Sequence, residues 1–82
     1  MVKDKQGYNG WTNWATWNTH LWITNYEDTH DLACQAARRY RDNLKGFRNY
    51  VVNLVLGEDW AEDLKGERQN INWGEIRKAL LD

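Results

Sequence analysis

Two histidines and the single cysteine are the side chains best suited to metal or nucleophile chemistry. His30 and Cys34 are four residues apart, a spacing that places two metal ligands on one face of a helix. A structural zinc site would also need His20 from another helix and a fourth ligand, either Glu27 or Asp31. A nucleophilic Cys34–His30 pair would need an orienting group and an oxyanion site, and no glycine-rich turn suggests one. We therefore expect Cys34 to pack as a small apolar residue.

Carboxylates at helical spacing form the second candidate. Glu58 with Glu62, and Asp59 with Asp63, could act as acid and base or hold a divalent ion. Adjacent acids on a surface helix are usually only solvated. The sequence has no phosphate-binding glycine loop, nucleophile elbow, dinucleotide fingerprint or paired-cysteine metal motif. We therefore expect no enzymatic activity, no catalytic residue, no metal and no cofactor.

The segment 9–22 combines tryptophans with amide and hydroxyl side chains. One interpretation is an aromatic, hydrogen-bonding platform for a partner, made by Trp14, Trp17, Asn13 and Asn18. In the alternative, the tryptophans form the core and the polar residues build a turn and a helix cap. Four indoles within twelve residues are difficult to bury completely in a small domain. The prediction is that Trp14 and Trp17 remain available to a partner.

A basic cluster lies between Arg38 and Arg48. Its net charge is +4, from Arg38, Arg39, Arg41, Lys45 and Arg48 against Asp42. A helix running through Gly46 would bring four of these cations to one side, namely Arg38, Arg41, Lys45 and Arg48. That side is a candidate for contact with nucleic-acid phosphates, and the alternative is a solvated face with local ion pairs. The stretch 58–67 has five acids and one lysine, a net −4, and could mimic phosphates toward a basic host protein.

Composition limits the classes of protein that this chain can form. It has 82 residues, six tryptophans, no proline and one cysteine, which indicates one small domain without an internal disulfide. The formal charge of −1 gives no overall attraction to nucleic acid or to an anionic membrane. No leader or long apolar run is evident, so the expected location is the cytoplasm, without membrane association. The aromatic content would supply the stability that other small domains take from disulfides or metals.

Helical spacing predicts the elements that position these groups. Residues 1–10 are expected to form a flexible arm, and 11–82 a single helical domain. The first helix follows a cap at Thr12 or Asn13, with the tryptophans and Leu21 toward the core and only Ile23 off that face. The second helix follows a cap at Asp28 or Thr29 and has small alanines on its inner face. Gly46 is expected to act as a C-cap or hinge.

The second half of the chain contains one ambiguous segment. Residues 47–56 have the β-branched density of a strand, but their three- and four-residue spacing favours a helix. A short acidic helix is predicted over 58–64, then a loop over 66–70. A last helix opens at Asn72, whose spacing to Glu75 suits a variant capping box. The sequence thus predicts an all-α domain of four to five short helices around a tryptophan-rich core of Trp11, Trp22, Trp60 and Trp73.

Both ends of the chain carry motifs with a resemblance to a known group. The stretch Asn9-Gly10-Trp11-Thr12-Asn13, with Thr16-Trp17 and Leu21-Trp22, resembles the start of small, largely uncharacterised proteins of phages, plasmids and prokaryotic genomes. The tail 72–81 is similar to theirs, with a Trp-x-Glu-Ile helix that ends in paired leucines. Ala15 stands where those proteins commonly have glutamate, so the return bond of a capping box is expected to be absent. The resemblance implies a helical domain of mobile-element origin.

These observations predict a non-enzymatic protein-binding module of phage or mobile-element type. It would inhibit or modulate a host protein, such as a defence or gene-expression component. The alternative is a small nucleic-acid-binding regulator that uses Arg38, Arg41, Lys45 and Arg48. A homodimer through exposed indoles or through Val51 and Val52 is a further alternative.

Overall fold

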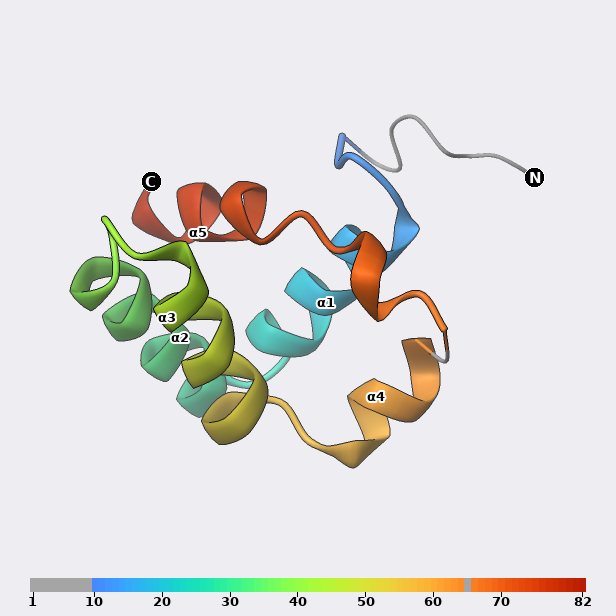
Figure 1. Cartoon of the computed structure of the whole chain (residues 1–82). Coiled ribbons are helices and arrows are strands. Elements are labelled where there is room, and N and C mark those ends of the chain that lie inside the picture. The colour runs from blue at the N-terminus through green and yellow to red at the C-terminus, as the bar shows by residue number, and fades with distance from the viewer. Residues whose placement is uncertain (1–9, 65) are drawn as a thin grey trace.

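The computed structural model describes residues 10–64 and 66–82, which form five α-helices, two short helical segments and no β-strand. In chain order these are α1 (Trp14–Thr24), α2 (Glu27–Arg39), α3 (Leu44–Tyr50), the π-helix η1 (Val51–Val55), α4 (Glu58–Leu64), the 3-10 helix η2 (Arg68–Asn70) and α5 (Trp73–Leu81) (Figure 1). The predicted all-α class is confirmed. The predicted arm 1–10 lies outside the described residues except for Gly10. None of the described helices is both long and apolar enough to cross a membrane.

Helix α1 connects the two ends of the domain. It packs against α2 and α5 on one side and against α4 on the other. Helices α2, α3, η1 and α5 contact one another at one end, whereas α4 lies at the opposite end of the molecule (Figure 1). The chain between α4 and α5 must therefore return across one face of the domain.

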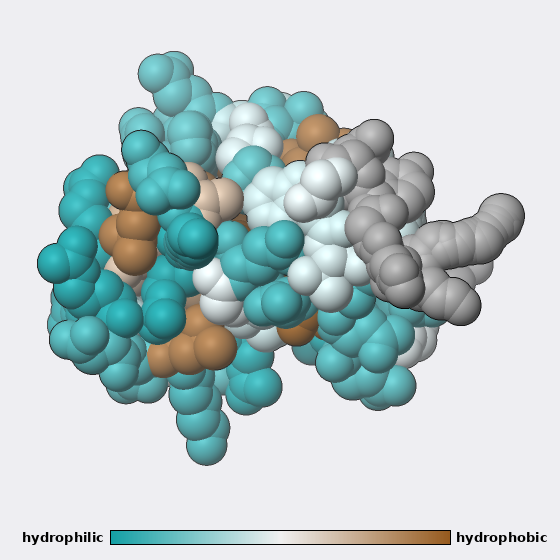
Figure 2. All heavy atoms as spheres, turned by 90° about the horizontal axis from the view of Figure 1, so that it is seen from above, coloured by the Kyte–Doolittle hydropathy of each residue, from teal (hydrophilic) through white to brown (hydrophobic). Residues whose placement is uncertain are grey.

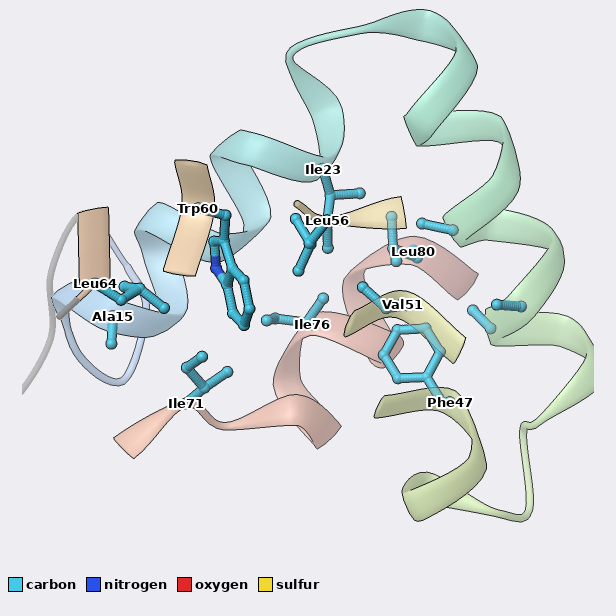
Figure 3. Close-up of a cluster of buried hydrophobic side chains, with 13 residues drawn as sticks. Ala15, Ile23, Phe47, Val51, Leu56, Trp60, Leu64, Ile71, Ile76 and Leu80 are labelled. Carbon is cyan, nitrogen blue, oxygen red and sulfur yellow. The ribbon is translucent and has the colours of Figure 1, made fainter. Parts of the chain in front are cut away.

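The core is mainly aliphatic, with one phenylalanine and one tryptophan among its larger side chains. Figure 3 shows Trp60, Ile76 and Phe47 converging from different helices. Small residues of α2, among them Ala33 and Ala37, are fully buried and allow close approach of its neighbours. Of the six tryptophans only Trp60 is buried, at 2% exposed. The predicted tryptophan-rich core is thus one buried indole and a rim of partly buried ones, which are Trp11, Trp14, Trp22 and Trp73.

Helix α1 buries a different face from the predicted one. Its buried residues are Ala15, Thr16, Asn18, Thr19 and Ile23. Ile23 was predicted to lie off the core face but is 0% exposed, and Leu21 was predicted to face the core but is 44% exposed. The prediction was wrong because the threonine hydroxyls find internal hydrogen-bond partners, which removes most of the cost of burying them.

The start of α2 is set by contacts to the preceding helix. It begins at Glu27, and Tyr26 occupies the cap position without a side-chain cap, so the predicted cap at Asp28 or Thr29 is wrong. The Thr29 hydroxyl instead donates to the carbonyl oxygens of Ile23 at 2.7 Å and Tyr26 at 3.0 Å. Thr29 therefore fastens the beginning of α2 to the end of α1.

The chain breaks between α2 and α3 rather than at Gly46. Helix α2 ends at Arg39, and Asn43 caps α3 by accepting from the Gly46 amide at 3.0 Å. Gly46 lies in the first turn of α3, so it is neither a C-cap nor a hinge. A Cβ at this position would lie 2.7 Å from Tyr40 Cδ1. The close approach of the Tyr40 ring is therefore what requires glycine.

The ambiguous segment 47–56 is helical. Helix α3 continues into η1, and the Leu56 amide donates to the Val51 carbonyl at 2.8 Å, the five-residue step of a π-helix. Val51 is fully buried and Val52 is partly buried. Val51 therefore cannot contribute to the exposed dimer surface that the sequence suggested for this pair.

The two motif-bearing ends of the chain meet at the beginnings of α1 and α5. Asn13, one of the two predicted candidates, caps α1, and Asn72 caps α5 as predicted. The predicted capping box between Asn72 and Glu75 is not formed, because the Glu75 carboxylate accepts from Thr12 instead of from Asn72. The Asn72 amide donates to the Thr16 hydroxyl at 2.9 Å, and the Thr12 amide donates to the Glu75 carboxylate at 3.0 Å. The Glu75 carboxylate of α5 thus accepts from the Thr12 amide, the role that a glutamate at position 15 would have in a capping box. We call these two hydrogen bonds, from Asn72 to Thr16 and from Thr12 to Glu75, the N-terminal clasp.

Candidate binding groove

A groove opens between the α3–η1 segment and the chain that returns from α4 to α5. Its first hollow has a volume of about 530 Å³. Two indoles line it, those of Trp60 and Trp73, and its polar lining side chains are Arg48, Asn49, Asn53, Arg68 and Gln69. Its two walls are separate in sequence and both line this hollow.

A second hollow of about 810 Å³ adjoins the first. Arg48 and Trp73 line both hollows, so these two side chains stand where the hollows meet. Lys45 and Leu44 of α3 lie on one side of the second hollow, and Asn72 of the clasp lies on the other. We call the two adjoining hollows together the groove.

The groove is positively charged. Lys45, Arg48 and Arg68 line it, and none of the lining residues that the structure describes is acidic. All three cations are exposed. Among the residues that the structure describes, none of the three contacts a carboxylate. A buried or paired cation would offer little to a ligand, whereas these three can donate to an anion.

One wall of the groove packs against the core. The Arg68 guanidinium carbon lies 5.3 Å from the centroid of the Trp60 ring, within the range of a cation–π contact. The Trp60 indole donates to the Thr19 hydroxyl at 2.9 Å and meets Trp73 edge-on at 6.4 Å. A guanidinium stacked in this way keeps the N–H groups at its edge free to donate.

The opposite wall follows from the helical path of α3 into η1. Arg48 with Val52, and Asn49 with Asn53, are pairs four residues apart, so they form two adjacent rows along one helix surface. The π-helical turn widens this surface at its end, and such turns are frequent at functional sites. The result is a row of amide and guanidinium groups that faces Arg68 and Gln69.

The structure does not assemble Trp14, Trp17, Asn13 and Asn18 into one open platform. Asn13 caps α1, and Asn18 is 6% exposed and donates to Asp63 at 2.6 Å. Trp14 is half-buried against the core, and Trp17 is half-buried on α1 and makes a contact of its own. The two asparagines thus have structural roles, and a role of the two indoles in binding stays a prediction.

The four predicted basic residues are all exposed but do not share one helix. Arg38 belongs to α2, Arg41 to the connection after it, and Lys45 and Arg48 to α3. The condition for aligning all four, one helix from Arg38 to Arg48, is not met, because the chain turns between Tyr40 and Asn43. Lys45 and Arg48 line the groove, whereas Arg38 and Arg41 do not.

The histidines and the cysteine do not form a metal site among the described residues, where no group of three potential ligands is present. His20 packs against the Trp11 ring with centroids 4.5 Å apart. Burial, and secondly the positive charge of His30, lower the pKa of His20 below its ordinary value. Cys34 is a free thiol packed at the edge of the core.

The acidic pairs of α4 also separate into different environments. Glu58, Asp59 and Glu62 are exposed. Asp63 accepts from Asn18 at 2.6 Å and from the Trp22 indole at 3.2 Å, so it fastens α4 to α1. Asp63 therefore has a structural role, and its presence requires no catalytic or metal-binding function.

Several groove residues were not singled out from the sequence. Arg68 and Gln69 lay in a segment predicted to be a loop, and Trp73 was assigned to the core. The i, i+4 repeat of Asn49 and Asn53 is the one local signal that points to this surface. Nothing local indicates that the returning chain lies opposite α3.

Comparison with known proteins gives one finding. A family model described as a family of unknown function, DUF7249, matches residues 4–80. No curated protein and no solved structure matches the chain.

Proposed function

The chain belongs to the DUF7249 family, whose function is unknown, and we propose that it is a non-enzymatic module that binds a partner protein. Binding occurs in the groove between α3–η1 and the returning chain. The module is of phage or mobile-element type, acts in the host cytoplasm, and inhibits or modulates a host protein of defence or gene expression. The resemblance of both chain ends to proteins of phages and plasmids supports this origin.

The observation that carries the proposal is a pair of adjoining hollows whose described lining combines three cations with no acid. Such a groove offers directional hydrogen bonds and charge on a wall that packs against the core. On the face shown in Figure 2, hydrophobic residues appear as separate small patches among hydrophilic ones, so this face presents no broad apolar surface. Recognition of the partner is therefore assigned to the polar groups of the groove.

Affinity capture from a bacterial lysate tests the proposal. The intact chain should retain a protein, and the variant Lys45→Glu/Arg48→Glu should lose it. The matched control Arg38→Glu/Arg41→Glu makes the same charge change outside the groove and should retain it. Loss of the partner in Trp14→Ala or Trp17→Ala alone, with the groove variant still active, would move the interface to α1. Failure of the intact chain to retain any protein would contradict the proposal.

Nucleic-acid binding is the second candidate, favoured by the exposure of all four cations Arg38, Arg41, Lys45 and Arg48. A mobility-shift titration at low and at high salt distinguishes it, because binding driven by phosphates weakens steeply as salt rises. In this case Arg38→Glu/Arg41→Glu should weaken binding as much as the groove variant does. Absence of a shift at low salt would exclude this candidate.

A further inference from the structure

The groove has a more specific chemistry than its positive charge alone. Arg48 comes from α3 and Arg68 from η2, so each wall of the first hollow contributes one guanidinium. A guanidinium binds a carboxylate through two parallel hydrogen bonds, which gives direction as well as charge. Two guanidiniums on opposite walls suit two acidic groups carried by one ligand.

Amide side chains line the same hollow as the two arginines. Asn49 and Asn53 come from one wall and Gln69 from the other. Each amide donates and accepts, which matches the alternating N–H and C=O groups of an extended peptide. This arrangement binds a main chain while the arginines bind its side chains.

A short peptide is enough to test this chemistry. An extended segment of about seven residues spans roughly 23 Å, at about 3.3 Å per residue. This length is similar to the 24 Å extent of the molecule along its second axis.

The same surface is poorly suited to nucleic acid. Single-stranded nucleic acid binds by stacking its bases on exposed aromatic faces. Of the two indoles in the groove, Trp60 is 2% exposed with Arg68 over its ring, and Trp73 is partly buried against the core. Glu67 directly precedes Arg68, and the formal charge of the chain is −1. A long run of phosphates therefore gains no attraction from the rest of the chain, whereas a short acidic segment needs only the cations of the groove.

We infer that the groove binds an extended acidic segment of a partner protein, whose aspartate or glutamate carboxylates pair with Arg48 and Arg68. This inference rests on the proposed function, because it names the chemistry of the partner at the same groove.

Calorimetric titration with an aspartate- and glutamate-rich peptide of about seven residues tests the inference. A peptide of equal length with asparagine and glutamine in place of the acids, and a thymidine oligonucleotide, serve as comparison ligands. The test variant is Arg48→Gln/Arg68→Gln. Its matched control, Arg38→Gln/Arg41→Gln, removes the same charge outside the groove, and a thermal melt verifies that both variants are folded.

The inference requires that the acidic peptide binds the intact chain and the neutral peptide does not. The dissociation constant should rise at least about tenfold in the groove variant and stay unchanged in the control. Binding of the oligonucleotide but not the peptide would overturn the inference, as would equal losses in the two variants. If lysate capture still depends on Lys45 and Arg48 while the peptide does not bind, the inference fails and the proposed function stands.

Discussion

Thr19 holds the one buried tryptophan in place. Its hydroxyl is 0% exposed and accepts from the Trp60 indole at 2.9 Å. Thr19→Val keeps the shape of the side chain but leaves the indole N–H unpaired in the core. The free energy of unfolding should fall by about 1–3 kcal/mol, measured by urea denaturation. Thr24→Val, which removes a partly exposed hydroxyl bonded to a helix carbonyl, should cost less. Equal losses would indicate that Thr19 has no special role.

Gly46 is the residue that the Tyr40 ring covers most closely. In Gly46→Ala the new Cβ would lie 2.7 Å from Tyr40 Cδ1, so the ring must move. Overpacking costs about 1–3 kcal/mol and helix propensity returns up to about 1, which predicts a net loss of stability. Gly74→Ala is the control, because its Cβ would meet Asn72 Oδ1 at an ordinary 3.5 Å. A Gly46→Ala protein as stable as the control would contradict this packing.

The His20 ring should make folding depend on pH. Its folded-state pKa is lowered from 6.5 by burial and secondly by His30, so the unfolded chain takes up the proton first as pH falls. Stability should therefore be constant above 6.5 and decrease as pH falls below it. Urea midpoints about one unit above and below 6.5 measure this change. His20→Phe keeps a ring against Trp11 and should reduce the pH dependence. An unchanged dependence would assign it to other groups.

At the scale of elements, the N-terminal clasp joins the beginnings of α1 and α5. Glu75→Ala removes the acceptor for the Thr12 amide and a negative charge near two helix N-termini. Its expected cost is about 0.5–1.5 kcal/mol in a chemical denaturation series. Glu75→Gln retains an acceptor oxygen and should cost less. Glu62→Ala on the exposed face of α4 is the control, and a clasp variant no less stable than this control would show that the clasp adds nothing.

Elements with local signals could be predicted from the sequence, and those governed by distant contacts could not. The acidic helix α4 and the Asn72 cap of α5 follow from spacing and capping chemistry within one turn. The buried face of α1 does not, since Thr16 and Thr19 are buried through bonds to residues more than forty positions away. Hydrophobic periodicity gives no weight to a threonine whose partner is remote in sequence.

The candidate site divides in the same way. Lys45 and Arg48 could be identified because they belong to a basic cluster in the sequence. Arg68 acquires its role only when the returning chain places it over Trp60 and opposite α3. The charge pattern of the sequence therefore identifies the wall with Lys45 and Arg48, whereas the wall with Arg68 can be identified only from the tertiary fold.

At the scale of the whole molecule, opposite charges lie in different regions of a small domain. The basic stretch 38–48 has a net +4 and the acidic stretch 58–67 a net −4, although the chain as a whole has −1. The groove displays cations on a body without a net positive charge. Such a surface attracts a short acidic segment locally and offers little to a long polyanion.

The central claim is that partners bind in the groove rather than on the tryptophans of α1. The most direct test records the indole N–H resonances of the isotope-labelled protein while the acidic peptide is added, with each indole assigned by a Trp→Phe variant. The account predicts that the Trp73 signal shifts as the groove fills, whereas those of Trp14 and Trp17 do not. Shifts of Trp14 and Trp17 with an unmoved Trp73 would contradict it.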